Sequence, residues 1–331
     1  MKKVLVTGAA GFIGSHVVSQ LLEKNVEVRA LIRPGEDTAN LAGMTIERME
    51  GDILDAEKIK QAVSGVDTVF HLAAIYAIWM PDWSRIYEVN IQGSRNVLWA
   101  AYQSDQIERV IFTSSISALG IAPGKSLSNE ETPFNQYTLG SHYVLTKYLS
   151  QQEALGFAKN GLDLVVVNPA FPFGPNDIAP TPTGKVIIDI VSGVNRTGFD
   201  GGMNIVDVRD VAEGHILAAE KGKTGECYAL ANSNVTIREL MKMVYRAMGK
   251  KGDFIPKIPL TLLKGATSAM SLWADRVSKK PPMSTPVDVS YVSSYLFFDN
   301  TKAKTELGLD FRPVETSIKE SIEWFKSRKM V

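Results

Sequence analysis

Tyr143 and Lys147 stand four residues apart in the stretch GSHYVLTKYLSQQE, residues 140–153. We expect a helix over about 138–159, and residues four apart then share one helix face and can reach a common site. A tyrosine has an ordinary pKa of about 10, and a nearby ammonium group would lower that pKa towards neutral pH. Such a pair can exchange a proton with a bound molecule. The spacing alone does not separate this role from two residues that merely share a helix.

A second group of hydroxyls is expected at the end of a strand. The stretch VIFTSSISALG carries Ser114, Ser115 and Ser117 directly after an apolar run. Ligands of open α/β sheets bind outside the carboxyl ends of the strands, so these hydroxyls would face a ligand. A hydroxyl at this place could hold a carbonyl oxygen while charge develops on it.

A glycine-rich turn follows the first predicted strand. KKVLVT runs into Gly8, Gly11 and Gly14 in VTGAAGFIGSHV, and a helical pattern follows. Such a turn lets backbone N–H groups approach a pyrophosphate, and the next helix turns its N-terminus to the negative charge. The spacing G-x-x-G-x-x-G departs from the common G-x-G-x-x-G, and a plain tight turn is the alternative. The strand, the helix and the N-terminal position favour a dinucleotide site that also includes Phe12 and Ile13.

The end of the second strand bears on which dinucleotide binds. The sequence VRALIRPGED places Ile32 and Arg33, and no acid, at the strand tip. An acidic residue would bind the ribose hydroxyl of NAD, whereas an arginine accommodates the 2′-phosphate of NADP. We therefore favour NADP(H). NAD(H) stays possible, because Glu36 or Asp37 could turn towards the ribose.

Other strand ends complete the expected cofactor site. The expected contacts are Asp52 and Ile53 near the adenine, then Leu72, Ala73 and Ala74 from HLAA, and Thr113, Pro169 and Phe171 at later strand ends.

The elements that would position these residues alternate between strand and helix in the first half of the chain. This alternation predicts parallel βαβ units and a Rossmann-type doubly wound sheet, with a long helix over about 83–104. Beyond about residue 172 the alternation breaks, and Pro and Gly cluster in AFPFGPNDIAPTPTG. We expect residues 1–171 to form mainly the NAD(P)-binding body. Residues 172–331 would form mainly a smaller substrate-binding region, interleaved with returning elements of the body.

The composition excludes several other classes of protein. Lys plus Arg and Asp plus Glu number 36 each, so no net charge attracts nucleic acid or a membrane surface. Cys227 is the only cysteine, which rules out an internal disulfide framework and favours the cytoplasm. His and Cys are not clustered, so we expect no metal site.

Two apolar stretches need an explanation. MKKVLVTGAAGFIG is better explained by a strand that enters a glycine turn than by a signal peptide. IPLTLLKGATSAMSLWADRV, residues 258–277, is interrupted by Lys264 and ends in charges, so we expect no integral membrane segment there. An amphipathic helix near a binding cleft is the prediction.

The order of these motifs resembles the extended branch of the short-chain dehydrogenase/reductase superfamily over essentially the whole chain. TGAAGFIG resembles its cofactor motif, FTSS its serine-bearing strand, YVLTK its Tyr-Lys motif and FFDNTKAKTELGLDFRPVETSIKESIEWF its closing segment. The resemblance implies catalysis by Ser115, Tyr143 and Lys147, with Ser117 in support and Asn90 of YEVNIQGSRNV bracing the site. It also implies a homodimer formed through the helices over 83–104 and 138–159.

Two segments narrow the resemblance. AIYAIWMPDWSRIYEVNIQGSRN and NPAFPFGPNDIAPTPTGKVIIDIVSG are similar to a group known as hopanoid-associated sugar epimerases. That group lies near the dihydroflavonol reductases and 3β-hydroxysteroid dehydrogenases.

The choice between these activities rests on the expected substrate loops. Extended-branch enzymes that use nucleotide sugars commonly place an arginine before the V-x-D-V-A helix, where this chain has Met203. The expected substrate contacts Tyr76, Trp79 and Phe173 are aromatic and suit flat or apolar ligands, although core packing is the alternative for each. The sequence therefore favours NADP(H)-dependent reduction of an apolar, aromatic or steroid- or flavonoid-like ketone or aldehyde.

Two alternatives stay open. One is an NAD-dependent nucleotide-sugar epimerase or dehydratase, and the other is a cofactor-binding regulatory protein without turnover. His142, next to the tyrosine, is expected to point away from the site around the helix.

Overall fold

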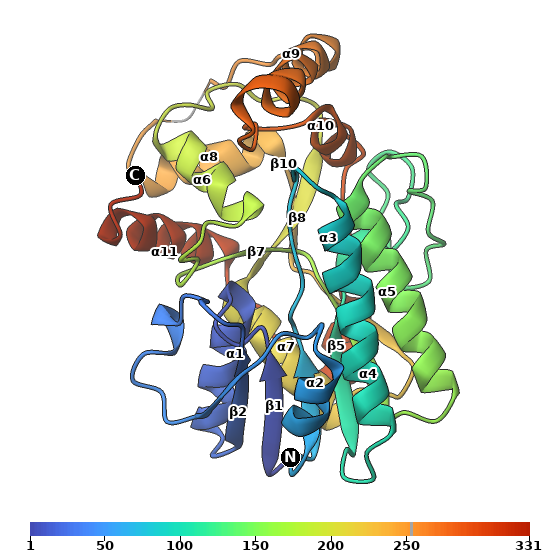
Figure 1. Cartoon of the computed structure of the whole chain (residues 1–331). Helices are drawn as coiled ribbons and strands as arrows, with labels where there is room; N and C mark the ends of the chain where they lie inside the picture. The colour runs from blue at the N-terminus through green and yellow to red at the C-terminus, as the bar shows by residue number, and fades with distance from the viewer. Residues whose placement is uncertain (252–253) are drawn as a thin grey trace.

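The computed structural model describes residues 1–251 and 254–331 (Figure 1). Its body is a seven-stranded sheet in the order β3-β2-β1-β4-β5-β6-β9, with every neighbouring pair parallel. The strands are β1 (Lys3–Thr7), β2 (Glu27–Ile32), β3 (Glu47–Glu50), β4 (Thr68–His71), β5 (Arg109–Thr113), β6 (Leu164–Pro169) and β9 (Cys227–Leu230). The predicted Rossmann-type doubly wound sheet is confirmed.

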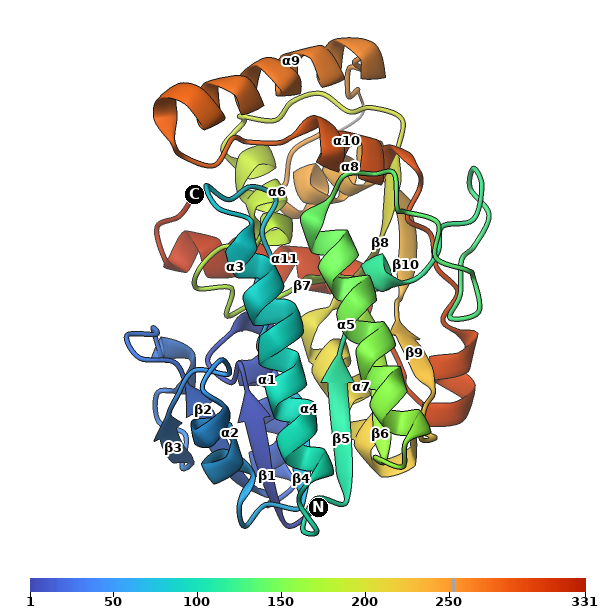
Figure 2. The ribbon, with the colours of Figure 1, turned by 45° about the vertical axis from the view of Figure 1, so that its right-hand side comes forward.

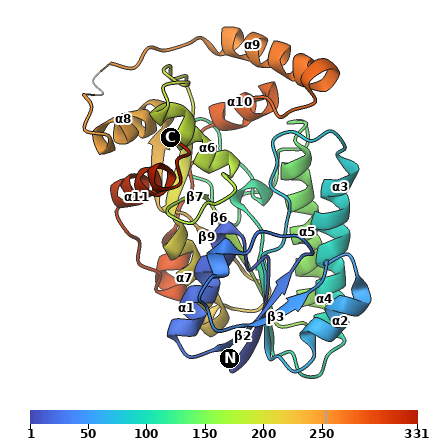
Figure 3. The same cartoon turned by 60° about the vertical axis from the view of Figure 1, so that its left-hand side comes forward.

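Helices cover both faces of this sheet, as Figure 3 shows. One face carries α1 (Phe12–Glu23) packed against α7 (Val208–Lys221). The other carries α2 (Ala56–Val63), α4 (Ser94–Tyr102) and α5 (His142–Lys159). Two separate apolar clusters fill these layers, one on each face. The central strands are buried on both sides, which explains the unbroken apolar run LVVV in β6.

The expected helix over 83–104 is one helical stretch made of three segments. These are α3 (Ser84–Tyr87), the π-helical η2 (Glu88–Gly93) and α4. A π segment accommodates an extra residue in the helix and often lies at a functional site. Here it contains Asn90.

A smaller region is built on the three-stranded sheet β10-β8-β7, in which β7 (Phe171–Phe173) is parallel to β8 (Gly202–Asp207) and β10 (Ser233–Thr236) is antiparallel to it. The helices α6 (Pro182–Val191), α8 (Ile237–Ala247) and α11 (Val314–Ser327) share an apolar core with this sheet. Thr236 and Glu239 form a capping box that fixes the start of α8.

Two further helices lie at the outer end of the molecule, beyond this smaller region (Figure 2). They are α9 (Leu260–Trp273), continued by the π-helical η4 (Ala274–Ser278), and α10 (Pro286–Ser293). The short helices η1 (Ala39–Leu41), η3 (Ile116–Ala118) and η5 (Ala303–Leu307) complete the chain. Among the helices of the described ranges, none is both long enough and apolar enough to cross a bilayer.

Candidate active site

One large cavity of about 960 Å³ lies between the sheet of the body and the smaller region. It begins at the turn after β1, passes the ends of β4 and β5, and ends under α9 and α10. Eighteen of the predicted site residues line it: Gly8, Gly11, Phe12, Ile13, Gly14, Arg33, Asp52, Ile53, Leu72, Ala73, Ala74, Tyr76, Thr113, Ser115, Tyr143, Lys147, Pro169 and Phe171.

The glycine turn is held too closely for any side chain. A Cβ on Gly14 would lie 2.0 Å from the Gly8 carbonyl oxygen, and one on Gly8 would lie 2.8 Å from the Ala73 nitrogen. Gly8 also has a φ of +69°, in the left-handed region that favours glycine. Gly11 caps α1 without a side-chain hydrogen bond, so the first turn of the helix presents its N–H groups to the cavity. This geometry fits the pyrophosphate of a dinucleotide.

The adenosine end of the cavity lies beyond β2 and β3. The exposed Arg33 lines it, and its backbone N–H donates to the Glu36 carboxylate at 3.0 Å. That carboxylate is thus bonded to the turn itself. The Asp52 carboxylate accepts the Leu54 N–H at 3.0 Å and pairs with Arg85 at 3.4 Å. An arginine at the tip of β2 and an ordered carboxylate after β3 suit the adenosine of a dinucleotide.

The centre of the cavity holds the serine, tyrosine and lysine. Ser115 caps η3 directly after β5, and its Oγ accepts the Ser117 N–H at 3.2 Å. Tyr143 and Lys147 extend from successive turns of α5 into the same cavity. The Lys147 ammonium donates to the Thr113 carbonyl oxygen at 3.0 Å. The end of β5 with η3 and the helix α5 thereby meet at the carboxyl edge of the sheet.

The pKa values of this group differ from the expectation for the tyrosine. Burial raises the pKa of Tyr143 to about 12, and interaction with the Ser115 and Ser117 hydroxyls lowers it only in part. Burial also lowers the pKa of Lys147 to about 8. We expected the Lys147 ammonium to lower the pKa of Tyr143 by stabilising the phenolate. Instead the ammonium is bonded to a backbone carbonyl, and the effect of burial on the tyrosine prevails.

Asn90 fastens the wall of the cavity without lining it. The side chain is 1 % exposed, and its amide accepts the Ile75 N–H at 2.7 Å and donates to the Ile75 carbonyl at 3.0 Å. It also donates to the Thr146 hydroxyl at 3.2 Å. The loop after β4 is thus fixed to α5 between Tyr143 and Lys147. Asn90 therefore acts as a positioning residue.

Two buried histidines support the same strand ends, and sequence reasoning missed both. The His71 ring bonds to the Thr7 hydroxyl through Nδ1 at 2.8 Å and to the Ser94 hydroxyl through Nε2 at 2.9 Å. The Thr7 hydroxyl also accepts the Ala73 N–H at 3.2 Å. Burial lowers the pKa of His71 to about 3. The signal was present in the sequence: a histidine inside an apolar strand needs buried partners.

His215 supports the end of β5 in the same way. Its Nε2 bonds to the Thr113 hydroxyl at 2.9 Å, and its Nδ1 bonds to the Val211 carbonyl at 2.7 Å. Burial lowers the pKa of His215 to about 4. Thr113, whose carbonyl oxygen accepts a hydrogen bond from the Lys147 ammonium, is therefore itself held in place by His215.

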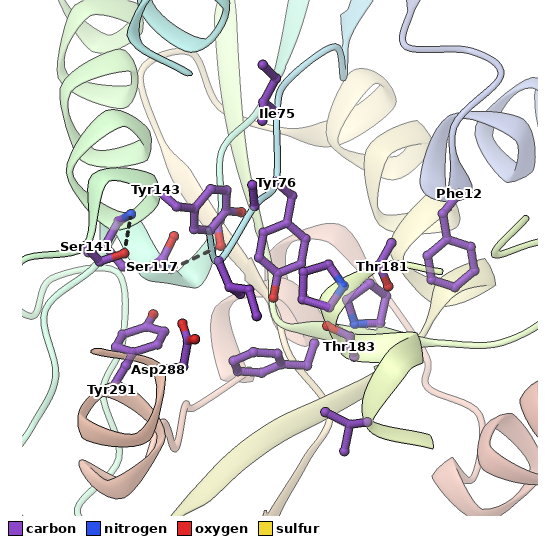
Figure 4. A pocket seen from close by; sticks show the side chains of 18 of the residues that line it. Phe12, Ile75, Tyr76, Ser117, Ser141, Tyr143, Thr181, Thr183, Asp288 and Tyr291 are labelled. Atoms are coloured by element: carbon purple, nitrogen blue, oxygen red, sulfur yellow. Dashed lines mark hydrogen bonds between the residues drawn. The ribbon is translucent and has the colours of Figure 1, made fainter. Parts of the chain in front are cut away.

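The far end of the cavity is where a substrate would lie (Figure 4). Tyr76 packs against Tyr143, with 4.6 Å between the ring centroids. Asp288 and Tyr291 of α10 form the facing wall together with Thr183. The rest of this wall is largely apolar, formed by Ile78, Val186, Phe199, Met203, Ile258, Leu263, Met270, Met283, Val287, Val289 and Val292.

Two predicted substrate contacts do not lie on the cavity. Phe173 is 2 % exposed and packs in the apolar core of the smaller region, together with residues of β8, α6 and α11. The Trp79 side chain turns outward and donates its indole N–H to the Asp275 carboxylate at 2.7 Å. His142 stacks on Trp83 and bonds to the Tyr87 hydroxyl, away from the cavity as expected.

The fold and this arrangement are those of an extended short-chain dehydrogenase/reductase. Residues 4–231 match the NAD dependent epimerase/dehydratase family, and the chain belongs to that family.

Named relatives match over nearly the full length. A Synechocystis protein with the provisional name dihydroflavonol 4-reductase is 34 % identical, over 98 % of this chain and 95 % of its own. Sterol demethylase protein B of Methylococcus capsulatus is 32 % identical, over 99 % of each chain. The crystal structure of gox2253 superposes with a TM-score of 0.88 at 36 % identity, over 100 % of both chains.

Proposed function

We propose that the protein is an NADP(H)-dependent reductase that converts an apolar ketone or aldehyde to an alcohol. The observation that carries the proposal is the cavity itself. Its proton-donating end, with Tyr143 and Ser115, faces a wall made mainly of apolar side chains. Such a wall suits a substrate without phosphate or sugar hydroxyls. Relatives named for a dihydroflavonol and a sterol support this substrate class.

In this proposal the residues have separate roles. The bound nicotinamide would supply the hydride. Tyr143 donates its phenolic proton to the substrate oxygen, and the Ser115 hydroxyl donates a hydrogen bond to the same oxygen. Because the Tyr143 pKa is raised to about 12, the phenol keeps its proton at neutral pH, as a proton donor must. Lys147, at the edge of the strands, would hold the ribose hydroxyls.

The division of the chain follows the same logic. Residues 1–171 would mainly bind the cofactor, and residues 172–331 would mainly bind the substrate. The preference for NADP(H) is supported by Arg33, which has no ion-pair partner among the described residues and lines the adenosine end. We also propose a homodimer through α4 and α5, because Trp99 is 50 % exposed and Tyr102 is 43 % exposed on that surface.

One observation favours a second candidate, a nucleotide-sugar epimerase or dehydratase. Arg196 lines the far end of the cavity, and its guanidinium is exposed apart from one bond to the Gly193 carbonyl. A cation on the wall of the same cavity could bind the diphosphate of a nucleotide sugar. The apolar residues around it give the reductase the stronger support.

The test is a titration of cofactor-stripped protein with NADPH and NADH, followed by turnover on apolar ketones, aldehydes and nucleotide sugars. The proposal expects tighter NADPH binding and oxidation of NADPH with an apolar carbonyl compound. Tyr143→Phe should lower turnover by about 10³-fold while leaving NADPH affinity unchanged. Conversion of a nucleotide sugar without net cofactor consumption would establish the epimerase instead. Cofactor binding with no turnover on any compound would favour a regulatory protein.

A further inference from the structure

The helix α9 has two faces with different surroundings. It lies at the outer end of the molecule, far from the seven-stranded sheet, in all three views (Figures 1–3). Its inner face lines the cavity through Leu263, Thr267 and Met270. On its other side, Thr261, Gly265, Ser268 and Leu272 are exposed. α9 is therefore the thin wall between the substrate end of the cavity and the outside.

The outer face of α9 is apolar. Leu262, Ala269, Leu272, Trp273 and Val277 are exposed apolar residues and form one stripe along α9 and η4. Leu262 is 65 % exposed, Trp273 61 % and Val277 56 %. Large apolar side chains gathered on one exposed stripe mark a surface that binds something.

Exposed basic side chains lie on the same segment as this stripe. Lys264, Arg276, Lys279 and Lys280 are all exposed. From residue 254 to 280 the sequence has a single acidic residue, Asp275, which accepts the indole N–H of Trp79. The zero net charge of the whole chain, from which we expected no attraction to a membrane surface, hides this local concentration of positive charge.

We propose that the outer face of residues 260–280 docks on an anionic lipid bilayer, with α9 lying in the plane of the interface. Apolar residues with a tryptophan on one side and Lys and Arg beside them are the composition of interfacial helices. Basic residues near an anionic surface add attraction that neutral lipid does not supply. A second copy of the chain is a poorer occupant, because pairing two stripes brings like charges together.

Docking in this orientation would place the cavity beside the membrane. The bilayer would contact one face of α9 while the other face lines the substrate end. Asp275 joins the end of the docking surface to the loop that carries Trp79 and, three residues earlier, Tyr76. An apolar substrate would then reach the cavity from the lipid without crossing water, a consequence that rests on the proposed function.

The test measures vesicle binding of the full chain by co-sedimentation, with no turnover involved. Vesicles contain phosphatidylcholine alone, or three parts of phosphatidylcholine to one of phosphatidylglycerol, at low and high salt. We expect binding to the anionic vesicles that high salt weakens. Lys264→Glu/Lys279→Glu/Lys280→Glu should reduce the partition coefficient by about 100-fold or more. Leu262→Gln/Trp273→Gln should reduce it by about tenfold or more.

A matched control separates this surface from the charge of the whole protein. Lys60→Glu/Lys159→Glu/Lys326→Glu changes the net charge equally on exposed residues of other elements and should retain vesicle binding. Three results would overturn the proposal: no binding to anionic vesicles, equal loss in the control, or binding unaffected by either α9 variant. If ultracentrifugation shows that the apolar variant dissolves a dimer while vesicle binding persists, the stripe is a contact between two copies instead.

Discussion

His71 and His215 should make the folded protein sensitive to mild acid. Both rings are buried, with His71 2 % and His215 0 % exposed, and burial lowers their pKa values from 6.5 to about 3 and about 4. An unfolded chain takes up protons at these sites below pH 6.5, whereas the folded chain does not. Their contribution to stability is therefore complete above pH 6.5 and falls as the pH drops towards the folded-state values.

The size of the effect follows from the pKa differences. Between about pH 7.5 and pH 5, each histidine should cost about 2 kcal/mol of unfolding free energy. Asp177 acts in the opposite direction, because burial raises its pKa to about 6 and the folded protein takes up a proton first. Its gain over the same range is about 1 kcal/mol, so these three groups together should lower stability by about 3 kcal/mol.

A single variant isolates the part due to His71. Urea unfolding of the wild type and His71→Asn at both pH values gives the change in unfolding free energy with pH. The variant should lose about 2 kcal/mol of that change, whatever its absolute stability. Ser94→Ala is the control, because it removes a hydrogen bond of the ring but leaves the buried histidine in place. If His71→Asn showed the same pH dependence as the wild type, a neutral buried His71 could not explain the acid sensitivity.

Three further outcomes are expected from substitutions. Gly14→Ala should weaken NADPH binding by about 100-fold in a fluorescence titration, because its methyl group would displace the turn that presents the N–H groups. Unchanged affinity would show that the pyrophosphate does not bind at this turn. Asn90→Ala should lower the unfolding free energy by about 3 kcal/mol and kcat more than the KM for NADPH, since it leaves the Ile75 backbone unpaired; an equal rise in KM would contradict the positioning role. Trp99→Asp should convert the dimer to monomer in ultracentrifugation, whereas Phe254→Asp, on an exposed aromatic outside α4 and α5, should not; a monomeric wild type would refute the proposed interface.

The parts of the fold that follow from local pattern were predictable from the sequence. Apolar runs such as LVVV and the glycine turn between β1 and α1 are short-range signals, and each gives one element. The sequence predicted that some elements beyond residue 172 would return to the body. It did not predict that β9 would pair with β6. Its pairing joins Cys227 to Val166, and no local pattern specifies a neighbour so distant in the chain.

The candidate site was predictable where a residue's place follows from its element. Tyr143 and Lys147 share a helix face, so their common direction was determined once the helix was assigned. The surroundings of Trp79 depend on loop geometry, and those of Phe173 depend on where the smaller region packs against β7, which the composition of a segment does not specify. The pKa of Tyr143 depends on how much water the fold excludes and on the carbonyl that Lys147 binds instead, and both are tertiary properties.

The late position of β9 and α7 in the chain has a consequence for synthesis on the ribosome. Until about residue 230 has left the exit tunnel, α1 lacks the helix that packs on it and β6 is an open sheet edge. A nascent chain at this stage exposes a Val-rich strand whose N–H and C=O groups can pair with another chain. The sheet is therefore completed only after most of the protein has been made. The longer synthesis takes between β6 and β9, the longer the open edge of β6 can pair with another chain.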